Sequence, residues 1–208
     1  TSVSAQLKPH EVIHILNDYF GRMVEIIVRY RGTIDDLQGD GILVFFGAPL
    51  RAEDDAERAV ACAIDMQRAM PEINELQRQK NLPELSMGIG INTGEVVVGN
   101  IGSEKRTKYG AVGTPINTTY RIESHTVAGQ ILISHATYER VNTKLTVRDT
   151  TQVQFKGIDQ PMTLYDILGI EGKYNLALSE VNKEALTALE TPLRISCFVI
   201  EGKTVSKN

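Results

Sequence analysis

Residues 32–47 read Gly-Thr-Ile-Asp-Asp-Leu-Gln-Gly-Asp-Gly-Ile-Leu-Val-Phe-Phe-Gly, and this stretch decides the fold. Two runs rich in β-branched and apolar residues, 33–37 and 42–46, are separated by a tight segment that contains two glycines. Such a pattern is typical of a β-hairpin. Its turn exposes Asp40, and two interpretations stay open: ordinary turn chemistry, or a ligand for a hard cation such as Mg²⁺, which takes one or two protein carboxylates together with substrate phosphates.

Helices are expected on both sides of this hairpin. Apolar residues recur at helical spacing over 9–30, and Pro9 is suited to a first helical turn. After the hairpin, Asp54 and Asp55 are suited to cap and charge a second helix that runs to about Met70. Pro71 is expected to kink or restart that helix.

The rest of the first 168 residues alternates between short strands and helices. A strand pair is expected over 85–92 and 95–100 around Thr93-Gly94, and later elements over 109–112, 115–125, 131–134, 136–141, 153–156 and 163–167. This order predicts an α+β fold with helices on one face of a mostly antiparallel sheet.

The pattern changes after about Gly169. Residues 181–189 are a polar helix candidate, and 193–200 form an apolar run typical of a strand, with no evident partner. We therefore divide the chain into a domain over 1–168 and a linker with the start of a further element over 169–208.

Composition places the chain among ordinary globular proteins. It has 208 residues, of which 42% are hydrophobic and 23% charged. The net charge of −4 argues against binding to the nucleic-acid backbone. The local cations Lys105, Arg106 and Lys108 form either a solvated loop or a small anion site. Cys62 and Cys197 lack disulfide or metal spacing, and no apolar run spans a membrane, so we expect a reduced, cytoplasmic domain of a full-length protein that could itself be membrane-attached.

A second candidate site lies on the predicted helix that begins near Pro115. Asn117 and Arg121 are four residues apart and so share one helix face, where an amide and a guanidinium can hold a ribose hydroxyl and a phosphate oxygen. An exposed helix face, or an arginine that pairs with Glu123, explains the same residues. Lys156, before Gly157, means little by itself.

Four segments, taken in order, carry a resemblance to a known family. They are Gly-Asp-Gly at 39–41, Gly-Ile-Asn-Thr-Gly-Glu-Val-Val-Val-Gly-Asn-Ile-Gly at 90–102, Tyr-Gly-x-x-Gly-x-x-x-Asn-x-x-x-Arg at 109–121, and Lys-Gly-x-x-x-Pro-x-x-Leu-Tyr at 156–165. The sequence resembles the class III adenylyl and guanylyl cyclase catalytic domain over residues 1 to about 168, and most closely its bacterial and cyanobacterial homodimeric members. The resemblance implies a ferredoxin-like, antiparallel-rich sheet covered by helices, in a wrapped homodimer.

The resemblance also implies a reaction and its residues. A purine nucleoside triphosphate would be closed into its 3′,5′-cyclic monophosphate, with release of pyrophosphate. Asp40 would bind metal, Asn117 would orient the ribose, Arg121 would stabilise charge at the α-phosphate and Lys156 would contact the triphosphate. Two divalent cations, Mg²⁺ or Mn²⁺, are implied, as are active sites shared by two protomers and regulatory domains elsewhere in the full-length protein.

The sequence departs from the family pattern in two features. The family's first metal carboxylate lies in an Asp-x-x-Gly-Phe-Thr-like strand, and Thr1-Ser2 correspond to the end of that motif, so we expect this carboxylate upstream of Thr1. Four residues before the metal aspartate, adenylyl cyclases usually carry lysine and guanylyl cyclases glutamate, whereas this chain has Asp36. The other base-reading position, Gly110, offers only its backbone and fits neither pattern.

A carboxylate at position 36 favours GTP, because it accepts from the N–H groups of guanine but opposes a lone pair on adenine. An adenylyl cyclase, with Asp36 a solvated strand residue, and a catalytically silent regulatory domain are the alternatives. The Gly-Gly-Asp/Glu-Glu-Phe signature of diguanylate cyclases and the Walker-type loop are absent from the sequence.

Overall fold

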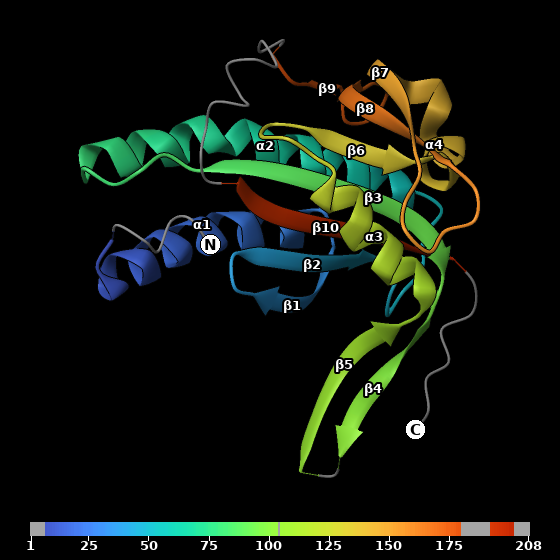
Figure 1. The fold of residues 1–208 in the computed structure, drawn as a ribbon, viewed down its shortest axis with the longest axis horizontal. Coiled ribbons are helices and arrows are strands. Elements are labelled where there is room, and N and C mark those ends of the chain that lie inside the picture. Colours follow the sequence, from blue (N-terminus) through green and yellow to red (C-terminus); the bar gives the residue numbers. More distant parts are fainter. Residues whose placement is uncertain (1–6, 104, 180–191, 202–208) are drawn as a thin grey trace.

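The computed structural model describes residues 7–103, 105–179 and 192–201, the last range as a backbone path (Figure 1). The elements in chain order are α1 (Pro9–Arg29), β1 (Thr33–Gln38), β2 (Gly41–Phe46), α2 (Asp55–Gln79), β3 (Ser86–Glu95), β4 (Val97–Ser103), β5 (Arg106–Val112), α3 (Thr114–Ser124), β6 (Ile131–Ser134), α4 (His135–Val141), η2 (Asn142–Lys144), β7 (Leu145–Val153), β8 (Met162–Ile170), β9 (Leu176–Ala177) and β10 (Pro192–Glu201).

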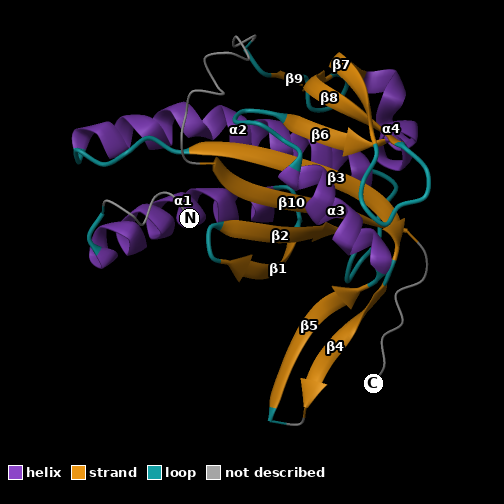
Figure 2. Ribbon diagram, viewed as in Figure 1, coloured by secondary structure: helices purple, strands orange, loops and turns teal. Residues whose placement is uncertain are grey.

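Within the described residues, eight strands form one mixed sheet (Figure 2). Its order is β1-β2-β10-β3-β6-β8-β7, with β9 beside β8, while β4 and β5 pair only with each other. The outer pairs are antiparallel, and the three central pairings β2-β10, β10-β3 and β3-β6 are parallel. The predicted α+β fold with an antiparallel-rich sheet is confirmed.

Helices α1 and α2 supply more than half of the buried residues in the larger hydrophobic core cluster. Apolar side chains of α1 are buried at helical spacing, at Ile15, Tyr19, Met23, Ile26 and Ile27. Helix α2 is longer than expected, because it continues through Pro71 without a break. The proline removes one backbone hydrogen bond, but Met70 and Ile73 beside it are buried, and this packing holds the helix together.

Strand β3 belongs to the sheet and has helices packed on both of its faces. Met87, Ile89 and Ile91 point into the core formed with α1 and α2. The alternate residues Gly88 and Gly90 face α3 and its following loop, where a Cβ atom on either glycine would collide. Figure 1 shows α3 in front of the sheet and the long helices behind it. The expectation that all helices cover one face is therefore wrong for α3.

The predicted strand pair around Thr93-Gly94 is also wrong. Strand β3 continues through both residues to Glu95, and its partners are β10 and β6. Strand β4 instead pairs with β5, in register from Val97 opposite Val112 to Ser103 opposite Arg106. This hairpin, which we call the arm, projects away from the sheet (Figure 1).

The apolar run near the carboxyl end forms a strand, as predicted, but it has partners. Strand β10 lies between β2 and β3 and is parallel to both, with Ile195 opposite Ile42 and Ile89. In the middle of a sheet it satisfies the backbone groups of two neighbouring strands. The division of the chain near residue 169 stays a prediction, and the helix candidate at 181–189 lies outside the described residues.

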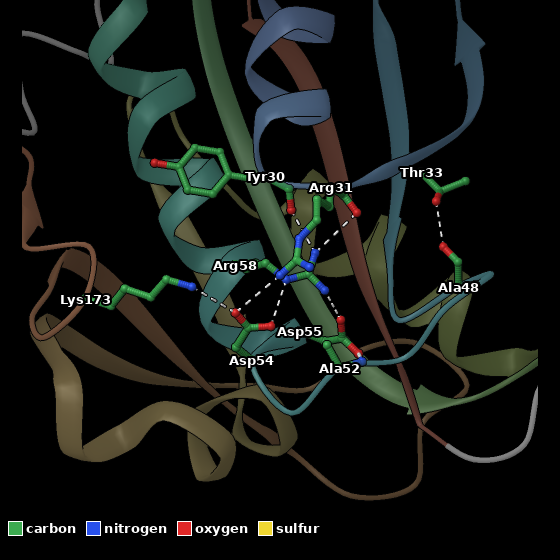
Figure 3. Close-up of polar contacts among 9 residues, drawn as sticks. All are labelled: Tyr30, Arg31, Thr33, Ala48, Ala52, Asp54, Asp55, Arg58 and Lys173. Carbon is green, nitrogen blue, oxygen red and sulfur yellow. Dashed lines mark hydrogen bonds and ion pairs between the residues drawn. The ribbon is translucent and has the colours of Figure 1, made fainter.

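A buried polar cluster fixes the start of α2 against the end of α1 (Figure 3). The Arg58 guanidinium, with only 5% of its side chain exposed, pairs with Asp54 and Asp55 and donates to the carbonyls of Tyr30 and Arg31. Asp54 is the N-cap residue, but its side chain makes no capping hydrogen bond, because Arg58 and Lys173 occupy it. The predicted cap is thus replaced by an ion-pair cluster.

Other differences have simple causes. The sequence suggested a strand at 153–156, whereas β7 begins at Leu145. Strand β7 is the last strand of the sheet and most of its residues are polar and exposed, so it lacks the apolar pattern that predicts a strand.

Cys62 is buried in α2, as expected, whereas the side chain of Cys197 lies outside the described part. Among the described residues, no helix is long and apolar enough to cross a membrane.

Candidate active site

The turn between β1 and β2 presents Asp40 as predicted. Gln38 pairs with Gly41, so Gly39 and Asp40 form a two-residue turn. Gly39 has φ of 62°, a left-handed conformation that glycine adopts without strain. The Asp40 side chain is partly exposed and makes no hydrogen bond or ion pair with another described residue. Its carboxylate is therefore available to a ligand.

Helix α3 is held firmly against β3. The buried Asn92 side chain donates to the carbonyl of Pro115 at 2.9 Å, which anchors the first turn. Further along, the backbone of Glu123 lies directly over Gly90, so that a Cβ atom there would be 2.4 Å from the Glu123 nitrogen. These contacts fix the helix that carries Asn117 and Arg121.

Arg121 and Lys156 come together although they are 35 residues apart. The Arg121 guanidinium donates to the Lys156 carbonyl at 2.5 Å. Gly157, with φ of 78°, lets the loop turn beside the guanidinium. The ring of Phe155 packs edge-on against His125, which holds the loop on α3.

An open hollow of about 670 Å³ lies between α3 and this loop. Tyr120, Arg121 and Lys156 line it, and the Lys156 side chain is exposed. Asn117 is one turn before Arg121 on α3, and its side chain is exposed beyond the hollow. An anion in the hollow can contact the guanidinium of Arg121 and the ammonium of Lys156 on one side. The amide of Asn117 lies one helical turn away.

A second cluster forms where β1 meets the arm. The Lys108 ammonium lies 3.2 Å from Asp36 and 3.3 Å from Asp35. The β1-β2 register shifts between Ile34 and Asp36, so Asp35 is the extra residue of a bulge. A Cβ atom on Gly110 would lie 2.6 Å from the Asp35 Oδ1 atom. Asp35 thus lies against Gly110, and Lys108 of the same strand pairs with both Asp35 and Asp36.

The charges of this cluster, which we call the Asp35-Asp36-Lys108 cluster, act on Tyr120 in the wall of the hollow. The Tyr120 side chain is partly buried and lines the hollow. Burial raises the pKa of its hydroxyl, and the negative charges of Asp35 and Asp36 raise it further, so the cluster acts electrostatically on the wall of the hollow. The hydroxyl stays neutral and can donate a hydrogen bond near neutral pH.

The described residues fit a divalent cation only in part. No group of three or more His, Cys, Asp or Glu side chains among them is arranged to hold a metal ion. Asp40 is a single unpaired carboxylate, which suits a hard cation whose other ligands are substrate phosphates. Asp40 does not line the hollow of Arg121 and Lys156 within one chain.

Sequence reasoning missed Lys108 and Asp35 as parts of one arrangement with Asp36. Lys108 is two residues before Gly110 and so shares its strand face, a signal that was present in the sequence. The bulge at Asp35 has no comparable signal. Within the cation group at 105–108, Lys108 is paired with two carboxylates, whereas Lys105 and Arg106 are exposed.

The family described as adenylate and guanylate cyclase catalytic domain matches residues 1–169. Adenylate cyclase 1 of Rhizobium meliloti (strain 1021) is 29% identical over 172 residues, which cover 82% of this chain and 26% of that protein. The matched part of the chain therefore spans between about a quarter and a third of the length of the curated relatives.

Two solved structures are similar over most of their length. The crystal structure of the guanylyl cyclase Cya2 shares 53% identity and superposes with a TM-score of 0.84, covering 86% of this chain and 90% of that one. The adenylyl cyclase CyaB from P. aeruginosa shares 33% identity with a TM-score of 0.74, covering 85% and 90%.

Proposed function

This chain belongs to the family of adenylate and guanylate cyclase catalytic domains, and from that premise we propose that it converts GTP into 3′,5′-cyclic GMP and pyrophosphate. The observation that carries the choice of GTP is the Asp36 carboxylate, which lies 3.2 Å from the Lys108 ammonium on the strand that also carries Gly110. Guanine presents two N–H donors to a carboxylate, whereas adenine presents a lone pair on the ring nitrogen. A mismatch of this kind costs about 1 to 3 kcal/mol in a buried site.

The residues around the hollow suit the proposed reaction. The ribose 3′-oxygen forms a bond to the α-phosphorus, the bond from that phosphorus to the departing pyrophosphate breaks, and the hydroxyl proton passes to solvent water. Asn117 holds the ribose in line for this attack. Arg121, already fixed by the Lys156 carbonyl, meets the charge that grows on the α-phosphate oxygens. Lys156 contacts the triphosphate with its exposed ammonium.

Family members use divalent metal ions, and Asp40 is the residue of the described chain that would hold them. We place the second metal carboxylate in the segment upstream of Thr1. Magnesium or manganese at these ligands would neutralise the triphosphate and favour ionisation of the ribose hydroxyl.

We further propose a homodimer with two shared sites. Asp40 and the Arg121-Lys156 hollow do not meet within one chain, which supports a site completed by a partner. The arm carries apolar side chains in solvent, with Val97 and Val112 each 59% exposed on directly opposed positions. A second copy of the chain would bury them in a symmetric interface. The greater length of the curated relatives supports regulatory domains elsewhere in the full-length protein.

The test is to identify the product. The natural protein, including the residues upstream of Thr1, is incubated with GTP or ATP and with Mg²⁺ or Mn²⁺, and the products are identified by chromatography and mass spectrometry. We expect cyclic GMP and pyrophosphate in equal amounts. Cyclic AMP as the main product would make the chain an adenylyl cyclase, and no cyclic product with either nucleotide would make it a silent regulatory domain.

A further inference from the structure

A side chain at the base-reading position Gly110 would have to displace the Asp35 carboxylate. A Cβ atom there would lie 2.6 Å from the Asp35 Oδ1 atom, and the Asp35 side chain is only 10% exposed. That oxygen is buried without a hydrogen-bond partner, so the carboxylate is held by packing and by its other oxygen. Gly110 itself has no side chain, so a side chain that reads the base together with Asp36 comes from a neighbouring position.

Lys108 occupies that neighbouring position. It lies two residues before Gly110 in β5, and alternate residues of a strand share one face. Its ammonium lies 3.3 Å from the Asp35 Oδ2 atom and 3.2 Å from the Asp36 Oδ2 atom. Asp35 therefore positions Lys108, and Lys108 places a cationic donor directly beside the carboxylate that faces the base.

Lys108 remains a donor at neutral pH. Partial burial acts to lower the pKa of its ammonium, but the hydrogen bonds and charges of Asp36 and Asp35 outweigh burial and raise it. The side chain is 47% exposed, so a ligand can reach it without displacing the core. The cluster thus offers a carboxylate acceptor and an ammonium donor side by side.

This pair matches one edge of guanine. That edge carries the O6 acceptor next to the N1–H and 2-amino donors, whereas adenine carries an amino donor in place of O6. Resting on the proposed function, we propose that Lys108 is a specificity-determining residue, whose ammonium donates to guanine O6 while Asp36 accepts from N1–H and the 2-amino group. Asp35 is a positioning residue that holds the ammonium in place.

The test compares GTP with its 6-thio analogue, which keeps both N–H donors but has a weaker acceptor at position 6. The wild-type protein should prefer GTP by about tenfold in kcat/KM, the lower end expected for a hydrogen bond from a charged group. Lys108→Met should bring this ratio close to one, and Lys108→Arg should retain most of it. Lys105→Met is the matched control, since Lys105 lies on the same arm, is exposed and has no partner among the described residues.

Two results would overturn the assignment of Lys108. One is a ratio of GTP to 6-thio-GTP that Lys108→Met leaves at the wild-type value. The other is an equal fall in that ratio for Lys105→Met, which would show a general effect of arm charge. Both require measurable turnover of GTP, so they are distinct from failure of the proposed function, in which the wild-type protein forms no cyclic GMP.

Discussion

Gly90→Ala, which adds a single methyl group, should leave the protein folded but remove most of its catalytic activity. A Cβ atom there would lie 2.4 Å from the Glu123 nitrogen and 2.7 Å from its Cα atom, both in the backbone of α3. A backbone cannot rotate away as a side chain does. Ordinary van der Waals contact begins near 3.4 Å, so α3 must move by about 1 Å in Gly90→Ala.

Two effects of different size follow from this shift. Inserting a methyl group into a packed interface costs about 1 to 3 kcal/mol of unfolding free energy. Arg121 and Asn117 travel with α3, and a displacement of about 1 Å in positioning groups costs about 100-fold in rate. We therefore expect Gly90→Ala to remain folded and to lose nearly all of its turnover.

The assay pairs urea denaturation with the turnover number for cyclic nucleotide formation. The control is Gly21→Ala in α1, where a Cβ atom has no neighbour within 4 Å and alanine favours the helix by up to about 1 kcal/mol. The control should be equally or more stable and fully active. Turnover and stability in Gly90→Ala that both match the wild type would refute the claim that α3 is fixed by this contact.

Three further predictions concern single residues. Arg121→Ala should lower kcat by about 100-fold or more with little change in KM, because its charge acts on the transition state; steady-state kinetics in which KM alone rises would assign Arg121 to ground-state binding. Arg58→Met should destabilise the fold by about 3 to 5 kcal/mol in chemical denaturation, because it leaves the buried Asp55 carboxylate without its cation; a loss below about 1 kcal/mol would mean that Asp55 is neutral in the folded protein. Burial and the hydrogen bond to Asp65 raise the pKa of Tyr30 above 10.0, so its contribution to stability is complete below pH 10 and is lost as the pH rises further. Tyr30→Phe should therefore show a shallower fall of unfolding free energy above pH 10 than the wild type, and parallel curves would contradict this.

The sequence predicts those elements whose signals are local. The β1-β2 hairpin depends on its own turn residues, and α1 on the spacing of its own apolar side chains, so both match the structure closely. The break expected at Pro71 is absent because packing of distant residues around α2 outweighs a local preference. Strand β10 has its partners more than 95 residues away in sequence, and no local pattern specifies such a pairing.

One part of the candidate site is predicted from short motifs, and another part depends on tertiary structure. Short motifs predict Asp40, Asn117 and Arg121 as site residues, and these roles stay predictions, while the structure places the Arg121 guanidinium against the Lys156 carbonyl. The Asp35-Asp36-Lys108 cluster depends on a bulge in β1 and on the approach of the arm, which are tertiary features. The identity of residue 36 alone therefore does not predict the cluster.

The most direct measurement for the shared-site account mixes two inactive homodimers, one carrying Asp40→Asn and the other Arg121→Ala. After subunit exchange, verified by native mass spectrometry, one site of each heterodimer receives both damaged residues and the other is intact. We predict that each heterodimer regains about half of the wild-type activity per dimer, so that a statistical mixture regains about a quarter. If heterodimers form and cyclic GMP production stays at the background of the two parents, then Asp40 and Arg121 do not serve one site from two chains.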